Sequence, residues 1–229
     1  MKDFQKAGGI SAIISSASYI FAIGLYMTLM MPLANPNLGI HEYMTALIPM
    51  KSLVFIWNFS MYIIHGGSLV VLVLALYERL KISSPRLALV ASGFGCIWTG
   101  FVLLSGFINI WGNEALISLY GRNPDQAETF KNALTFITLG IDSSDRFIGS
   151  IWVILVSLAS FKSTKFPKIL NIFGLILGFG VLVLGLIMPV NDTTASLLFG
   201  LGTIVWWLIL GIKMIRRDPD STLPLHGKV

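Results

Sequence analysis

The sequence has 229 residues, of which 55% are hydrophobic and 12% are charged, and its formal net charge is +5. A soluble domain carries roughly 25% charged residues, so this composition excludes an ordinary water-soluble globule and indicates an integral membrane protein. The positive charges lie in short segments between apolar runs rather than on one face, which argues against nucleic-acid binding.

Six apolar runs of membrane-spanning length follow one another along the chain, since about 20 apolar residues cross a bilayer as a helix. Prolines and charged residues set their limits. The predicted spans are residues 9–31, 52–77, 87–111, 134–161, 168–189 and 194–215. The sequence therefore predicts an all-α fold, a polytopic transmembrane bundle of six helices that forms a single domain over residues 1–229.

The first run follows Lys2 and Lys6, as the apolar part of a signal peptide would. It extends over residues 8–31, however, whereas the apolar part of a signal peptide has about 7–15 residues. No convincing small-residue cleavage site follows it. We expect this segment to be retained as the first span.

Lysine and arginine residues are distributed unequally between the two sides of the predicted bundle. Twelve of the 16 fall on the side of both termini, three fall on the other side, and Arg146 lies within a span. Short loops with an excess of Lys and Arg stay in the cytoplasm. We therefore predict that both termini are cytoplasmic.

Two segments on the predicted outer side, residues 33–50 and 112–133, are longer than a connection needs. The second contains Asn123, Pro124 and Asp125, an order of capping residue, proline and acid that starts a helix. A helix that begins there can run straight into the fourth span. We expect both segments to be loops that either lie over the outer mouth of the bundle or pack at the membrane interface.

Three charged residues, Asp142, Asp145 and Arg146, interrupt the apolar run of the fourth span. Charge inside a bilayer is costly and commonly marks a functional site. Asp142 and Arg146 are four positions apart, so they face the same side of a helix and can form an ion pair. The cluster is therefore either a polar binding site or a structural ion pair that fixes helix packing. If the span begins later than residue 134, the charges lie near the outer interface.

A second polar stripe lies on the second span, where Asn58, Tyr62 and His65 follow helical spacing. Both spans run in the same direction, and their lengths place His65 and Asp145 at similar depth, roughly 20–24 Å from the inner ends. His65 is either a ligand-binding group or a buried histidine that is hydrogen-bonded to Asn58, Tyr62 or Asp145.

Aromatic residues occupy the middle of three other spans. Tryptophan usually marks the membrane interface, so mid-span tryptophans suggest the walls of an internal cavity, the alternative being ordinary bundle core. The candidate wall residues are Tyr19, Trp98 and Trp206.

Catalytic chemistry finds little support in this sequence. Ser143, Ser144 or Ser150 beside His65 and Asp145 would supply a nucleophile and a base, but serine is abundant and such a match is unspecific. One histidine and two carboxylates within the bundle are too few for a zinc enzyme, and a haem would find one good axial ligand. We therefore predict no catalytic residues, no metal and no cofactor.

Four segments carry a resemblance to a known family: residues 6–12, 145–152, 166–174 and 198–212. In these segments the chain resembles a large bacterial family of uncharacterised six-span membrane proteins. The resemblance implies the six-span topology and a bacterial origin, and hence a multi-pass protein of the inner, cytoplasmic membrane. Family members often carry an acidic residue near the start of the fourth span, which Asp142 or Asp145 matches. The family has no established activity to carry over.

These observations favour a protein that binds or transports a small polar or amphipathic ligand through a polar cavity open to the outside. A non-catalytic accessory subunit that binds another membrane protein is the alternative, and an intramembrane hydrolase comes third. The expected partners are the lipid bilayer, a small molecule or lipid, and either a membrane-protein partner or further copies of the chain, without nucleic acid. The predicted ligand-binding residues are His65, Asp142, Asp145, Arg146, Asn58, Tyr62, Tyr19, Trp98 and Trp206.

Overall fold

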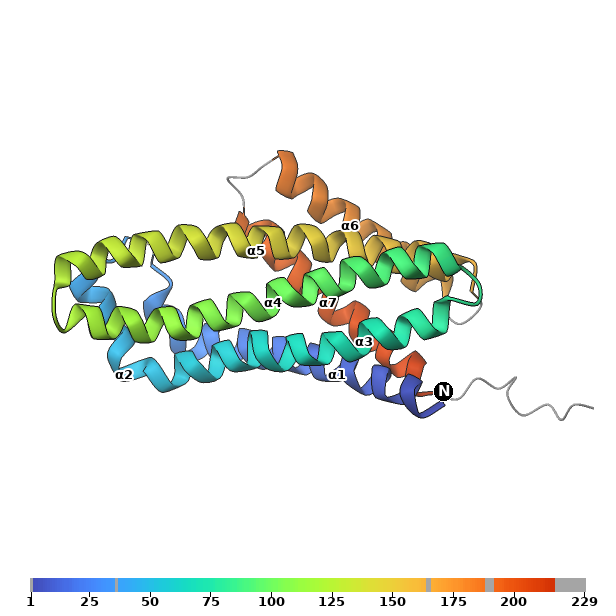
Figure 1. The fold of residues 1–229 in the computed structure, drawn as a ribbon, viewed down its shortest axis with the longest axis horizontal. Helices are drawn as coiled ribbons and strands as arrows, with labels where there is room; N and C mark the ends of the chain where they lie inside the picture. Colours follow the sequence, from blue (N-terminus) through green and yellow to red (C-terminus); the bar gives the residue numbers. More distant parts are fainter. Residues whose placement is uncertain (1, 36, 164–165, 188–191, 217–229) are drawn as a thin grey trace, which may run out of the picture.

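The computed structural model describes residues 2–35, 37–163, 166–187 and 192–216, and this part of the chain is all-α (Figure 1). The α-helices are α1 (Lys2–Leu25), α2 (Ile40–Asn58), α3 (His65–Leu80), α4 (Pro85–Tyr120), α5 (Pro124–Phe161), α6 (Lys168–Ile187) and α7 (Asp192–Ile215). Two π-helical segments, η1 (Tyr26–Met30) and η3 (Phe59–Ile64), and one 3₁₀ turn, η2 (Met31–Leu33), complete the helical structure of these described residues.

Within the described residues, six helical segments are long and apolar enough to cross a membrane, which confirms the predicted class. Helices α2 and α3 count as one of them, because η3 joins them without a break. The six segments are Asp3–Leu33, Ile40–Leu80, Pro85–Tyr120, Pro124–Phe161, Lys168–Gly185 and Thr194–Ile215.

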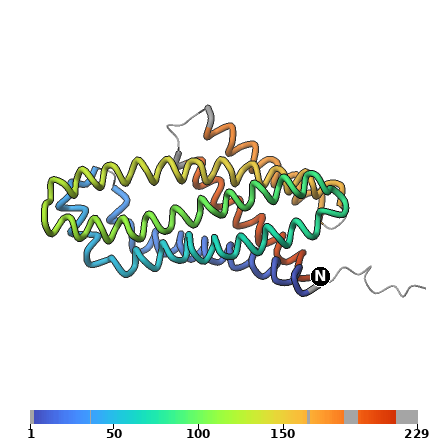
Figure 2. Tube along the Cα trace, viewed as in Figure 1, coloured from blue at the N-terminus to red at the C-terminus, as the bar shows by residue number. Residues whose placement is uncertain are grey.

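Helices α4 and α5 are much longer than a bilayer requires. They have 36 and 38 residues, which gives lengths of about 54 and 57 Å against a hydrocarbon thickness of about 30 Å. Helices α6 and α7 are shorter and accompany them over only part of their length (Figures 1 and 2). We call the end with the α4–α5 turn the distal end, and the opposite end, where α1 begins, the proximal end.

Much of the two segments predicted as loops is helical instead. Helix α4 continues beyond residue 111 to Tyr120, and α2 already begins at Ile40. Helix α5 begins at Pro124, as the capping pattern predicts, and the side chain of Asn123 accepts a hydrogen bond of 3.1 Å from the backbone N–H of Gln126. The expectation of loops was therefore wrong for residues 40–50 and 112–120, whereas the helix predicted from residue 124 into the fourth span is confirmed.

A second apolar core explains why these helices continue past the membrane. Buried side chains from η1, α2, α4 and α5 pack together at the distal end and remove apolar surface from water, which stabilises the extension. They are Met30, Ile40, Met44, Leu47, Val54, Leu116 and Ala127. A hydropathy pattern alone does not separate such a core from the end of a span.

The main core lies between the proximal and central parts of α1, α3, α4, α5, α6 and α7. Glycines permit the closest helix contacts there, as is common where membrane helices associate. Helices α1 and α7 meet at Gly9 and Gly211, where a Cβ atom added to either residue would lie within 2.8 Å of the other's carbonyl oxygen.

The π-helical segment η3 interrupts the second span immediately before His65. Such segments widen a helix locally, re-aim its side chains and are frequent at functional sites. Helix α1 packs against η3, and the hydroxyl of Ser60 donates a hydrogen bond of 3.4 Å to the carbonyl oxygen of Ser18. The irregular turn therefore fixes where Tyr62 and His65 stand relative to α1.

Candidate functional site

An aromatic cluster surrounds His65 in the middle of the bundle. The ring of His65 lies 4.8 Å from that of Tyr19 on α1, 6.2 Å from that of Trp98 on α4 and 4.8 Å from that of Trp207 on α7, measured between ring centroids. Trp98 and Trp207 stack with an interplanar angle of 22°. Four helices thus contribute one aromatic ring each, and His65, Trp98 and Trp207 are fully buried.

A further group of rings continues this cluster towards α5 and α6. Trp98 lies 5.2 Å from Trp152 and 5.8 Å from Phe199, and Trp152 lies 5.6 Å from Trp206. Aromatic pairs at such distances contribute about 0.5–1.5 kcal/mol each beyond their buried area. The rings are therefore a rigid part of the core as well as the wall of a candidate site.

Several polar atoms in this cluster are buried without a hydrogen-bond partner in the described part of the chain. They include both ring nitrogens of His65, the indole N–H groups of Trp98 and Trp207, and Oδ1 of Asp145. An unsatisfied buried polar group costs about 1–3 kcal/mol, so such groups are rare in native proteins and call for an explanation. Two indole N–H donors, an imidazole ring and a carboxylate oxygen therefore lie in an otherwise apolar interior without hydrogen-bond partners among the described residues.

The three charged residues of α5 stand beside the aromatic cluster. The hydroxyl of Ser105 on α4 donates a hydrogen bond of 2.9 Å to Oδ1 of Asp142. Arg146 donates a hydrogen bond of 3.2 Å to the hydroxyl of Ser143 and attracts both carboxylates. Asp142 is close enough to repel Asp145. Asp142 therefore has a fixed hydrogen-bond partner on the next helix, whereas Asp145 retains a buried oxygen that has none.

Gly149 brings Trp98 against the turn of α5 that carries Asp145. A Cβ atom added at Gly149 would lie 2.6 Å from Cε2 of Trp98 and 2.8 Å from Cζ of Phe199. The Trp98 indole consequently lies within interaction range of Asp145, four positions earlier, without completing a hydrogen bond to it. The glycine thus joins the charged cluster and the aromatic cluster into one site.

The packing against α4 sets the level of Asp145 relative to His65. On α5, Asp145 lies between Asp142, which meets Ser105 of α4, and Gly149, which meets Trp98 of α4. Gly66, next to His65 on α3, packs against Val102, which lies between those two positions of α4. The charged cluster and His65 therefore lie at a similar level in the bundle.

Most of the predicted site residues converge, but two do not. Tyr19 and Tyr62 both lie within electrostatic range of Asp142, Asp145 and Arg146. Asn58 instead lines a separate cleft between α2 and α4. Trp206 faces α6, because a Cβ atom added at Gly174 would lie 2.8 Å from the indole nitrogen of Trp206. Its ring contacts the aromatic cluster through Trp152.

Trp207, rather than Trp206, is the ring that contacts His65, and Ser105 is the partner of Asp142. Neither assignment could be made from the sequence. Adjacent residues on a helix point about 100° apart, so the two tryptophans of α7 face different neighbouring helices. Trp206 faces α6 and Trp207 faces His65 of α3. Only the packing of α7 decides which tryptophan faces which helix.

Metal and serine-hydrolase chemistry receive no support from the geometry. Among the described residues, no group of three or more His, Cys, Asp or Glu side chains could hold a metal ion. His65 has no hydrogen-bond partner in this part of the chain, so no serine–histidine pair forms there. A nucleophile needs a base within hydrogen-bond reach.

The fold and the site define a polytopic membrane protein with six apolar helices and a polar, aromatic-lined centre. The family model described as "Domain of unknown function (DUF4386)" matches residues 8–216. The chain therefore belongs to the DUF4386 family, which agrees with the predicted resemblance to an uncharacterised six-span family. No curated protein and no solved structure matches the chain in these comparisons.

Proposed function

We propose that this protein binds a small amphipathic molecule between α1, α3, α4, α5 and α7. The buried polar atoms of His65, Trp98, Trp207 and Asp145, which lack partners within the described residues, are the observation that carries the proposal. A ligand with a hydrogen-bond donor or a positive charge would be held by Asp145. Its apolar body would contact the aromatic rings, and a cation would gain a further cation–π attraction.

The distal side offers the approach to this site. Asp142, Asp145 and Arg146 are only partly buried, whereas the rings of His65, Trp98 and Trp207 beside them are fully buried. The rings fill the space between the helices, so a ligand can enter only if Trp98 or Trp207 turns. Trp152 and Trp206 close the cluster on the side of α6. Transport would require a second opening towards the proximal side of the bundle. We therefore propose that the protein binds its ligand and does not transport it.

Tryptophan fluorescence tests this proposal, because four of the six tryptophans belong to the cluster. We expect the emission of the purified protein in lipid nanodiscs to change when it is titrated with small amphipathic amines or alcohols. Asp145→Asn should weaken the response about tenfold or more, since it removes the charge that holds the donor. Asp125→Asn, on the exposed distal turn, is the matched control. If no compound acts, or if Asp145→Asn responds as the wild type does, the proposal fails.

A non-catalytic accessory role is the second candidate, and the distal extension favours it. Helices α2, α4 and α5 project past the ends of α6 and α7 (Figure 1) and present exposed polar side chains there, including Glu114, Arg122 and Glu128. Co-purification from native membranes would give a stoichiometric partner in this case. If a variant with a shortened α4–α5 turn no longer co-purified with this partner, the partner would be shown to bind the distal extension.

We also propose, from the excess of Lys and Arg at the proximal end, that both termini are cytoplasmic and that the distal end faces outward. Cys96 is the only cysteine, so a Cys96→Ser background permits single-cysteine labelling. We expect a membrane-impermeant maleimide to label Gln126→Cys in intact cells, and to label Ile82→Cys only after the cells are opened. The reverse pattern would contradict the orientation.

A further inference from the structure

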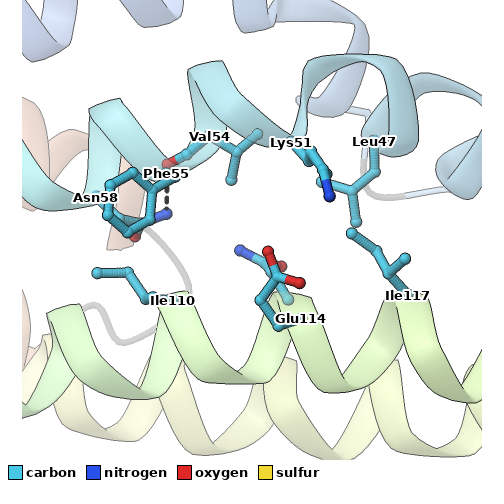
Figure 3. A pocket seen from close by; sticks show the side chains of 9 residues that line it. Leu47, Lys51, Val54, Phe55, Asn58, Ile110, Glu114 and Ile117 are labelled. Atoms are coloured by element: carbon cyan, nitrogen blue, oxygen red, sulfur yellow. Dashed lines mark hydrogen bonds between the residues drawn. The ribbon is translucent and has the colours of Figure 1, made fainter.

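A second polar site lies about 10–20 Å along the bundle from His65, in a cleft between α2 and α4 (Figure 3). Lys51 from α2 and Glu114 from α4 project into it from opposite sides. Both side chains are exposed, and within the described residues they form no ion pair with each other. The cleft therefore presents one positive and one negative charge, each available to a ligand.

Asn58 closes the inner end of this cleft and is 2% exposed. Its Nδ2 group donates a hydrogen bond of 2.8 Å to the carbonyl oxygen of Val54, which fixes the orientation of the amide (Figure 3). Its Oδ1 atom is buried and has no partner among the described residues. The cleft thus contains an unused hydrogen-bond acceptor next to a free carboxylate.

The size of the enclosed space suits a single small polar group. It measures about 10 Å³, which is room for about one water molecule, and a primary ammonium group is of similar size. Glu114 and the oxygen of Asn58 would both accept hydrogen bonds from such a group. Lys51 at the outer side would then attract an anionic group attached to it.

The level of the cleft matches that of lipid head groups. Asn58 lies 20 positions before Glu78, which with Arg79 marks the proximal end of the second span, and Lys51 lies 27 positions before it. At 1.5 Å per residue these separations are about 30 and 40 Å. The hydrocarbon is about 30 Å thick and the bilayer with its polar regions about 40–45 Å. The cleft therefore spans the distal head-group layer.

An exposed apolar strip leads from the cleft towards the middle of the bilayer. The ring of Phe55, which lines the cleft, stacks on that of Phe59 at a centroid distance of 5.8 Å. Phe55 is 48% exposed and Phe59 is 42% exposed. An acyl chain can lie along these rings while its head group occupies the cleft.

We propose that the cleft between α2 and α4 binds the head group of a phospholipid with a primary ammonium, such as phosphatidylethanolamine. Lys51 holds the phosphate, and the ethanolamine arm turns inward from it, so that Glu114 and Oδ1 of Asn58 hold the ammonium. An acyl chain lies along Phe55 and Phe59. This lipid site is separate from the site at Asp145 and does not depend on the function proposed there.

Native mass spectrometry of the full chain, released from nanodiscs, tests the proposal. The two lipids to compare are phosphatidylethanolamine and phosphatidylcholine of identical acyl composition. Phosphatidylcholine carries the same charges but has no N–H donors, so we expect it to bind about tenfold more weakly. Equal affinities for the two lipids would overturn the proposal.

Three variants locate the site. Glu114→Gln should reduce phosphatidylethanolamine binding to the level of phosphatidylcholine, and Lys51→Gln should weaken the binding of both lipids. Glu128→Gln, an exposed acid at the same end of the protein, should leave both unchanged. Wild-type binding by Glu114→Gln would overturn the proposal. Glu114 is exposed, so this variant should keep the thermal midpoint of the wild type, and that measurement confirms that a loss of binding is not a loss of folding.

A soluble head group distinguishes the source of the ligand. Glycerophosphoethanolamine lacks acyl chains and cannot use the strip formed by Phe55 and Phe59. We expect it to displace the lipid at least a hundredfold less effectively than a second phosphatidylethanolamine does. Displacement at equal concentrations would show that the cleft takes a water-soluble zwitterion, and the assignment to a lipid would be wrong.

Discussion

Replacement of Gly211 by alanine is expected to lower the free energy of unfolding by about 1–3 kcal/mol, as overpacking of a tight core does. A Cβ atom at this position would lie 2.7 Å from the carbonyl oxygen of Gly9, 3.0 Å from Cγ1 of Ile13 and 3.2 Å from Cβ of Ala12. The carbonyl oxygen belongs to the backbone of α1 and cannot turn aside as a side chain would. The two helices must therefore separate. The measurement is unfolding in detergent micelles, followed by tryptophan fluorescence.

Gly93→Ala is the matched control for this prediction. Gly93 is an exposed helical glycine of α4, and a Cβ atom there would meet no atom within 4 Å. Alanine favours helix over glycine by roughly 0.5–1 kcal/mol, so this variant should be as stable as the wild type or slightly more stable. Equal stability of Gly211→Ala and Gly93→Ala would show that α1 and α7 do not approach each other as described.

Asp145→Asn is expected to leave stability unchanged or to raise it by about 1 kcal/mol, while it weakens the ligand response about tenfold or more. Oδ1 of Asp145 is buried without a partner within the described chain, and Asp142 repels its charge. A charge at membrane depth is costly, and its removal relieves that cost. Gain of stability with loss of function is typical of a residue retained for binding rather than for folding. Thermal unfolding in nanodiscs, measured without ligand, gives the stability.

Asp142→Asn provides the comparison, because Asp142 has the hydrogen bond from Ser105 that Asp145 lacks. The amide oxygen of the introduced asparagine can still accept from Ser105, but a hydrogen bond to a charged group contributes about 1.5–3 kcal/mol and one between neutral groups about 0.5–1.5 kcal/mol. This variant should therefore be about 1 kcal/mol less stable than the wild type. If Asp145 instead belonged to a structural ion pair with Arg146, its replacement would cost about 3–5 kcal/mol. A loss of that size for Asp145→Asn would contradict the binding role.

The charged cluster shows how far the sequence could lead towards the site. Three charges within an apolar run identified Asp142, Asp145 and Arg146 as candidates without any structural information, because a bilayer makes such residues conspicuous. Helical spacing also placed Tyr62 and His65 on one stripe. The role of each carboxylate, however, depends on the neighbouring helix. Ser105 donates a hydrogen bond to Asp142. The Trp98 ring lies near Asp145 because Gly149 has no side chain in the space that the ring occupies.

The π-helical segment η3 shows where the spacing argument breaks down. Asn58, Tyr62 and His65 would share one face of a regular α-helix, but residues Phe59–Ile64 are π-helical, which changes the angle between successive side chains. Asn58 consequently faces the cleft with Lys51 and Glu114, whereas His65 faces Tyr19 and Trp207. No residue pattern in this segment predicts the π-helical turn.

The sequence by itself determined that this is a membrane protein with six spans, because the length and hydropathy of each run follow directly from the thickness and polarity of the bilayer. Only the tertiary structure decided that α2, α4 and α5 continue into a distal extension, and that Trp207 rather than Trp206 meets His65. The physical reason is that hydropathy reports the solvent around a helix, whereas these two features depend on which side chains of neighbouring helices fill the space between them.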